Sequence, residues 1–131
     1  MNLEASSYMS GGFPSQILNK NDLDDILRFA ISAGASEVYL TENDTPAMEI
    51  RRKKYPLIDR RINPLELNKL VQNLDRMGSK VMDLISSAKP YQSRHEVLID
   101  RDTGYEGFRV NTTRGYCNGD SIRMTFRHIP K

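Results

Sequence analysis

Apolar and polar residues alternate strictly near the end of the chain, on both sides of a turn signal. In the two arms, residues 108–111 and 122–127, the apolar residues fall on even positions and the polar residues on odd ones. The apolar positions are Phe108, Val110, Ile122, Met124 and Phe126. Asn118-Gly119-Asp120 lies between the two arms. Period-two alternation around such a turn predicts an antiparallel hairpin with one buried face.

The polar face of this hairpin carries arginines at opposed positions. If Val110 pairs with Phe126, then Arg109 lies opposite Arg127. Like charges directly across a ladder are destabilising, so the pattern favours a bound anion, and phosphate suits bidentate guanidinium groups best. A solvated sheet edge, with arginines that prevent edge pairing, explains the same pattern. The alternation alone leaves both interpretations open.

Helical periodicity marks two earlier stretches. Residues 21–33 place Leu23, Ile26, Leu27, Ala30 and Ile31 on one stripe. This spacing predicts a helix that Asn21 caps and Gly34 ends, with Asp22, Asp24 and Asp25 near its positive end. Asn63-Pro64-Leu65-Glu66 predicts the start of a second helix, because it combines a cap, a proline and an acid three residues after the cap. A shorter helix is expected from Ser79 to Ser86.

Short alternating runs predict strands over residues 36–41, 47–52, 57–62 and 91–100. The second and third runs form a hairpin in this interpretation, joined by Arg51-Arg52-Lys53-Lys54-Tyr55-Pro56. Four consecutive cations are typical of a patch for nucleic acid or acidic lipid. A solvated turn is the favoured interpretation, because no aromatic platform or second basic run accompanies them. The order of helix, three strands, two helices and three strands predicts an α+β fold with an antiparallel sheet and helices on one face.

The length and composition of the chain exclude several classes of function. The chain has 131 residues, which is one domain by size, and we expect a flexible tail over residues 1–20 and a folded body over 21–130. The net charge of +2 is too small to indicate a strong nucleic-acid binder. One cysteine and two histidines do not make a metal site at a standard spacing. The chain contains no G-x-x-x-x-G-K-[ST] phosphate loop and no catalytic constellation.

Four segments, in order, resemble a known family. Gly34-Ala35-Ser36-Glu37-Val38-Tyr39-Leu40 is similar to its G-A-S-D-[LI]-H-[LI] segment, and residues 45–51 with Arg60-Arg61-Ile62 are similar to the two strands that follow. Residues 108–111 with Arg114-Gly115, and Phe126-Arg127-His128-Ile129-Pro130, are similar to its R-V-N and F-R-x-I-P strands. Together they resemble the N-terminal domain of secretion ATPases of the PilT and GspE superfamily. Within it, the resemblance is to type IVB secretion and conjugation ATPases such as DotB and TraJ.

The resemblance implies a PAS-like domain that precedes a motor domain, which carries the phosphate loop. Arg109 and Arg127 match arginines that reach the nucleotide of the motor domain as arginine fingers, and Arg114 and Asn111 are further candidates for nucleotide contact. Tyr39 departs from the family, which has histidine there. ATP and Mg²⁺ are expected in the full-length protein and no cofactor in this domain alone.

The implied partners are the protein's own C-terminal motor domain, neighbouring subunits of a homohexamer, and components of an inner-membrane secretion system. The implied location is the cytoplasm, with peripheral attachment to that inner-membrane complex. Two other functions stay open: a free-standing PAS-like sensor of small ligands, and a module that binds nucleic acid or protein through residues 51–54. A sensor would need a cavity, whereas the apolar stripes look well filled and show no buried polar residue.

Overall fold

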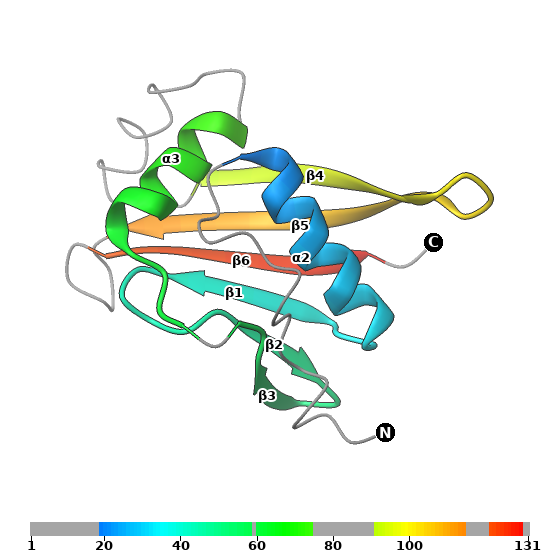
Figure 1. Ribbon diagram of the computed structural model, residues 1–131, viewed down its shortest axis with the longest axis horizontal. Helices are drawn as coiled ribbons and strands as arrows, with labels where there is room; N and C mark the ends of the chain where they lie inside the picture. Colours follow the sequence, from blue (N-terminus) through cyan, green and yellow to red (C-terminus); the bar gives the residue numbers. More distant parts are fainter. Residues whose placement is uncertain (1–18, 59, 75–90, 115–120, 130–131) are drawn as a thin grey trace.

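The fold is a single sheet with helices on one of its faces. The computed structural model describes residues 19–58, 60–74, 91–114 and 121–129. In this part of the chain, two helices lie across the same face of a six-stranded sheet (Figure 1). All neighbouring strands are antiparallel. The predicted α+β class, with helices on one face, is confirmed.

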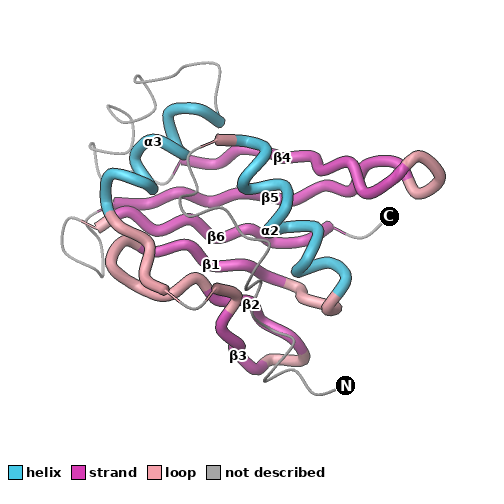
Figure 2. The backbone as a smooth tube through the Cα atoms, viewed as in Figure 1, coloured by secondary structure: helices cyan, strands magenta, loops and turns pink. Residues whose placement is uncertain are grey.

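The strand order joins segments that are far apart in sequence. The strands are β1 (Glu37–Thr41), β2 (Ala47–Ile50), β3 (Lys53–Pro56), β4 (Tyr91–Asp100), β5 (Gly104–Arg114) and β6 (Ile122–Ile129). Their order across the sheet is β3-β2-β1-β6-β5-β4, so β1 pairs with the last strand of the chain (Figure 2). The predicted register of the last hairpin is confirmed, since Val110 pairs with Phe126 and Arg109 with Arg127.

The core lies between the helices and the inner face of the sheet. The helices are α2 (Lys20–Ser32) and α3 (Pro64–Leu74). On β5 and β6 the buried residues alternate along each strand, and Phe108 and Phe126 are buried completely or nearly so. Truncating either ring to alanine should cost about 3–5 kcal/mol, because such a cavity cannot collapse fully.

The first helix begins earlier than the sequence predicted. Asn19, rather than Asn21, is its cap, because the Asn19 side chain accepts a hydrogen bond of 3.1 Å from the backbone N–H of Asp22. The cap also places Asp24 inside the helix, where it is buried instead of lying in the first turn. The predicted end is confirmed, since Gly34 has the positive φ of 84° that a helix stop requires.

The second helix begins as predicted. The backbone N–H of Glu66 donates to the Asn63 side chain at 2.8 Å, and the backbone N–H of Asn63 donates to the Glu66 carboxylate at 3.3 Å. This reciprocal pair is a capping box. The helix expected from Ser79 to Ser86 and the tail expected before the first helix lie outside the described residues, apart from Asn19 and Lys20.

The β2–β3 hairpin is shorter than predicted, and its second strand begins earlier in the sequence. Its second strand is Lys53–Pro56, which the sequence pattern assigned to the connection. The described residues of the range predicted as a strand, 57, 58 and 60–62, are not a strand. Ile50 pairs with Lys53, so only Arg51 and Arg52 form the turn (Figure 2). Leu57, Ile58 and Ile62 are still buried, because the segment after the hairpin packs against the core.

Candidate functional site

A line of charged side chains crosses the outer face of the sheet, which is the face opposite the helices. The strand registers bring together one residue from each of the six strands. From one edge to the other, this charged row consists of Arg94, Arg109, Arg127, Glu37, Glu49 and Lys54. Three guanidinium groups on β4, β5 and β6 are therefore followed by two carboxylates on β1 and β2 and an ammonium group at the β3 edge.

Arg127 is paired within the row. Its Nε and Nη2 atoms both lie 3.0 Å from Oε1 of Glu37. The Arg127 side chain is 66% exposed and Glu37 is 17% exposed, so the contact is open to water on the arginine side. An exposed pair of this kind is weak and exchangeable.

Arg94 turns along its own strand instead of toward its cross-strand neighbour. Its Nε lies 3.5 Å from the carboxylate of Glu96. Its guanidinium group also lies over Gly107, where an added Cβ would be only 2.9 Å from Nη2. The absence of a side chain at Gly107 thus makes room for Arg94 away from Arg109.

Arg109 occupies the middle of the three arginines and has no ion-pair partner in the described part of the chain. It is exposed and lies directly opposite Arg94 on one side and Arg127 on the other. Like charges at directly opposed positions destabilise a sheet, and the carboxylates of Glu37 and Glu96 pair with the two neighbours of Arg109. The arrangement therefore favours an anion at Arg109.

A shallow hollow of about 220 Å³ lies on the outer face at these arginines. It is lined by Gln92, Arg109, Asn111, Thr125 and Arg127. Amide, hydroxyl and guanidinium groups are all available to phosphate oxygens there. The structure thus brings together three of the four residues selected from the sequence. For the fourth, Arg114, it describes only the backbone, which pairs with Ile122 near the end of β5.

Tyr39 supports the carboxylate that holds Arg127. Its hydroxyl group contacts the carboxylate of Glu37 and lies 2.6 Å from that of Glu49. The Lys54 ammonium group lies 4.6 Å from the centroid of the Tyr39 ring. Burial, and then the two glutamates, raise the pKa of the Tyr39 hydroxyl above its ordinary value of 10, so it remains a hydrogen-bond donor.

The sequence did not predict the contacts of Tyr39 with Glu37 and Glu49. Odd positions of a short strand, Glu37, Tyr39 and Thr41, carry polar groups, and this alternation was the available signal. It could not show that β1 lies beside β6, because that pairing joins residues about 90 positions apart in the chain.

Both histidines pair with carboxylates on the helix side of the sheet and do not contribute to the hollow. His95 Nε2 lies 2.6 Å from Asp24 Oδ1, and His128 Nε2 lies 3.1 Å from Glu106 Oε1. His128 also packs against Phe108, with ring centroids 5.2 Å apart. The expectation that the core holds no buried polar residue is wrong, since Asp24, Glu66 and Thr112 are buried.

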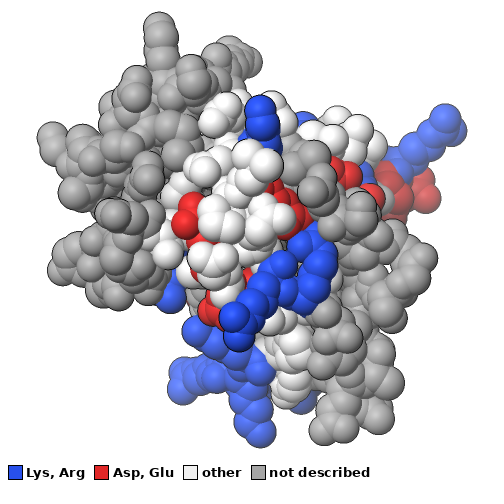
Figure 3. All heavy atoms as spheres, turned by 60° about the vertical axis from the view of Figure 1, so that its left-hand side comes forward, with Lys and Arg blue, Asp and Glu red and all other residues white. Residues whose placement is uncertain are grey.

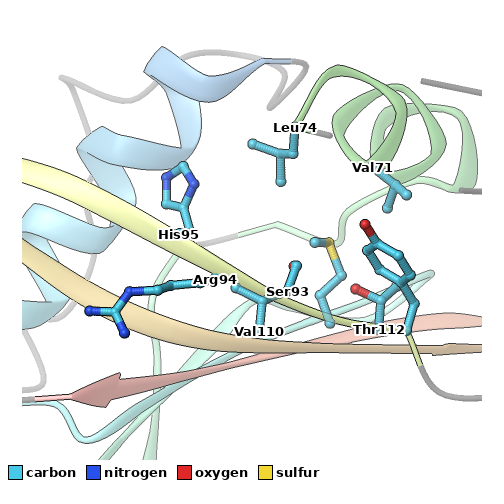
Figure 4. A pocket seen from close by; sticks show the side chains of 9 residues that line it. Val71, Leu74, Ser93, Arg94, His95, Val110 and Thr112 are labelled. Atoms are coloured by element: carbon cyan, nitrogen blue, oxygen red, sulfur yellow. The ribbon is translucent and has the colours of Figure 1, made fainter. Parts of the chain in front are cut away.

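A small cavity separates α3 from the inner face of β4–β6 (Figure 4). Its volume is about 50 Å³, and Val71, Leu74, His95 and Thr112 are among the residues that line it. Ligand-binding pockets usually measure about 300–1,000 Å³, so this cavity has room for a few waters at most. It gives no support to a small-ligand sensor.

Neither a metal cluster nor a membrane-spanning helix is present in the described ranges. Residues 19–58, 60–74, 91–114 and 121–129 contain no group of three or more His, Cys, Asp or Glu side chains that could hold a metal ion. No helix in those ranges is both long and apolar enough to cross a membrane.

The fold has counterparts among solved structures. No family model and no curated protein matches the chain. The ATPase DotB of Legionella pneumophila is similar over 92% of this chain and 32% of its own length, with a TM-score of 0.79 and 23% identity. DotB of Yersinia pseudotuberculosis is similar over 93% of this chain and 33% of its own, with a TM-score of 0.77 and 19% identity.

A third similar structure is the pilus retraction motor PilT with bound ADP. The similarity covers 82% of this chain and 29% of PilT, with a TM-score of 0.61 and 26% identity. The chain thus spans about one third of the length of DotB and somewhat less of PilT. This chain has the fold of the N-terminal region of DotB and PilT, in agreement with the resemblance that its sequence motifs indicated.

Proposed function

We propose that this chain is the N-terminal domain of an ATP-hydrolysing secretion or conjugation motor, and that Arg109 and Arg127 act on its nucleotide. The observation that carries the proposal is the opposed pair of arginines beside a hollow on the outer face of a DotB-like fold. DotB is an ATPase, and PilT is a motor whose structure contains ADP.

The nucleotide would be held by a separate motor domain. The chain has no phosphate loop of its own, so it supplies neither a backbone cradle nor a lysine to a triphosphate. ATP and Mg²⁺ would therefore bind to the part of a longer protein that corresponds to the remaining two thirds of DotB. The domain alone is not expected to hydrolyse ATP.

The two arginines would act by electrostatic stabilisation. Phosphoryl transfer spreads negative charge over the γ-phosphate oxygens, and a guanidinium group from another domain stabilises that charge. Arg109 has no ion-pair partner among the described residues, so it could bind phosphate directly. Arg127 would first have to release the carboxylate of Glu37. Asn111, which also lines the hollow, can donate an amide hydrogen bond to the same anion, and Arg114 is the fourth candidate.

The proposal extends to the assembly. A homohexamer would place this domain beside its own motor domain and those of neighbouring subunits, and the domain would move against the motor as ATP turns over. The assembly would work in the cytoplasm at the inner-membrane secretion complex. These features follow from the family resemblance rather than from any contact in the domain.

Steady-state ATP turnover of the whole protein tests the assignment. Arg109→Ala and Arg127→Ala should each lower kcat by about 1,000-fold or more, as is typical of arginine fingers. Arg109→Lys should recover only part of the loss, because an ammonium group keeps the charge but not the bidentate geometry.

Arg123→Ala is the matched control. Arg123 lies on β6 and is exposed, but it pairs with Thr113 and Thr41 and does not line the hollow. Its substitution removes the same charge from the same strand and should leave kcat unchanged. Normal turnover in both Arg109→Ala and Arg127→Ala would contradict the assignment, as would an equal loss in all three variants.

A further inference from the structure

A cluster of four cations lies at the end of the β2–β3 hairpin, away from the hollow. This basic tip consists of Arg51, Arg52, Lys53 and Lys54, all of which are exposed. None of them has an ion-pair partner in the described part of the chain. Lys and Arg side chains gather at the lower end of the molecule, where this hairpin lies (Figure 3).

Protection of a sheet edge explains only part of the tip. β3 is an edge strand, and lysine and proline on such a strand discourage pairing with another sheet. Lys53, Lys54 and Pro56 fit that purpose. Arg51 and Arg52 do not, because they form the turn and so lie outside the exposed ladder.

The backbone conformation of the turn at Arg51 and Arg52 is unfavourable for residues with side chains. Arg51 and Arg52 have positive φ angles of 52° and 69°, as a two-residue type I′ turn requires. Asn-Gly is the favoured sequence for this turn, because residues with larger side chains are strained in the left-handed region. Strained residues that persist in a fold are often found at functional sites, so two arginines in these positions indicate a use for their charge.

The cationic side chains of the basic tip point in different directions, and this bears on which kind of anionic partner they could bind. Lys54 pairs with Glu49 on the outer face, whereas Lys53 pairs with Ile50, which faces the core, so the two lysines point to opposite sides of the sheet. The arginines occupy the turn between them. A rigid duplex or a folded acidic protein would contact cations on one face only. Fluid anionic headgroups can rearrange around a projecting tip and neutralise all four.

We propose that the basic tip binds the anionic headgroups of a phospholipid membrane. A basic residue near an anionic surface increases partitioning by about fivefold, so four of them give roughly several hundredfold. Such an attachment uses surface charge and needs no membrane-spanning segment. It is independent of the nucleotide role of Arg109 and Arg127, because it involves neither the hollow nor ATP.

Sedimentation with vesicles tests the proposal on the chain as it stands. The protein should bind vesicles that contain phosphatidylglycerol and not vesicles of phosphatidylcholine alone, and binding should weaken as salt is added. The double variant Arg51→Asn, Arg52→Gly should bind phosphatidylglycerol vesicles about 25-fold more weakly. Its melting temperature should rise by several degrees, which separates the loss of binding from unfolding.

The double variant Arg101→Asn, Arg123→Gln is the matched control. It removes two exposed arginines from other parts of the surface and so changes the net charge equally. Its binding to vesicles should equal that of the unchanged protein. Equal losses in both double variants would overturn the proposal, since net charge alone would then be responsible. Tighter binding to duplex DNA or to polyglutamate at the same salt concentration would also overturn it.

Discussion

The ion pair between Arg127 and Glu37 distinguishes the two candidate arginines at the scale of single residues. Arg127 is held by a carboxylate that Tyr39 supports, whereas Arg109 has no such partner in the described part of the chain. Under the proposed function, phosphate would therefore compete with Glu37 for one of the two guanidinium groups. The pair should lower affinity for nucleotide while keeping Arg127 in place.

Glu37→Gln tests this competition in the whole protein. The amide removes the competing charge, so KM for ATP should fall by up to about fivefold, which corresponds to an exposed ion pair. The Tyr39 hydroxyl can still donate to the oxygen of the new amide, so kcat should change little. Glu96→Gln is the control, because it removes the partner of Arg94 on the same face. A higher KM in Glu37→Gln would show instead that Glu37 positions Arg127 for phosphate.

The contact between Asp24 and His95 has a consequence for acid stability. Burial raises the pKa of the Asp24 carboxyl, but hydrogen bonds and charges from His95 and Lys20 outweigh it, so the pKa lies below 3.8. A carboxyl with a lowered folded pKa stabilises the fold fully above its unfolded pKa. That contribution is lost as the pH falls through the folded pKa.

Asp24→Asn should therefore lower the free energy of unfolding by about 1–3 kcal/mol at neutral pH and by less at about pH 3. Urea denaturation at the two pH values measures both effects. Asp25→Asn is the matched control, because Asp25 is the next residue on α2, is exposed and pairs only with Arg28 among the residues described. It should change stability by less than about 0.5 kcal/mol. A constant loss at both pH values would contradict the role of the Asp24 charge.

At the scale of elements, the start of α3 depends on Glu66. Its carboxylate completes the capping box with Asn63 and lies 2.6 Å and 2.9 Å from the two terminal nitrogens of Arg60. The Glu66 side chain is fully buried, while that of Arg60 is 31% exposed. The hydrogen bond to Glu66 raises the pKa of Arg60 above its ordinary value, so Arg60 stays charged.

Two substitutions separate the roles of Glu66. Glu66→Ala removes the acceptor of both Arg60 and the Asn63 N–H and should lower the free energy of unfolding by about 3–5 kcal/mol, as measured by urea denaturation. Glu66→Gln keeps an oxygen for the cap but not the charge, so it should cost less. Glu96→Gln on the outer face is the control, because Glu96 is exposed and its charge contributes little to stability. Equal losses in the two Glu66 variants would show that only the charge matters.

Elements with a strong local pattern could be predicted from the sequence, and β3 could not. The stripe of α2, the capping box of α3 and the alternation of β5 and β6 each reflect burial of one face. β3 reads Lys53-Lys54-Tyr55-Pro56, which has no alternation because an edge strand buries little. Its turn lacks the glycine that normally marks a hairpin, so the pattern places the strand too late in the sequence.

At the scale of the whole molecule, the two faces of the sheet carry different kinds of side chain. The inner face and the helices form the core, while the charged row crosses the outer face. The opposition of Arg109 and Arg127 could be derived from one hairpin. The neighbours Glu37 and Arg94 could not, because they depend on the order of strands that the sequence pattern does not specify. The sequence thus predicted the two central arginines of the charged row but not the residues that flank them.

The distribution of charge predicts where a free polyphosphate binds to the isolated chain. The hollow beside Arg109 and the basic tip at residues 51–54 are both cationic, but only the hollow also offers the amides of Asn111 and Gln92 and the hydroxyl of Thr125. Tripolyphosphate should therefore shift the NMR amide signals of β5 and β6 more than those of the β2–β3 turn. ATP should shift the same signals, because nothing in the hollow is specific for a base.

Arg109→Ala should abolish these shifts at β5 and β6, while Arg123→Ala should preserve them, since Arg123 lies outside the hollow on the same face. Binding through opposed guanidinium groups also predicts that added salt weakens the shifts. Shifts confined to residues 51–54 in the unchanged protein would contradict an anion site at the hollow. The arginine row would then be a solvated surface, and the nucleotide role of Arg109 and Arg127 would lose its structural basis.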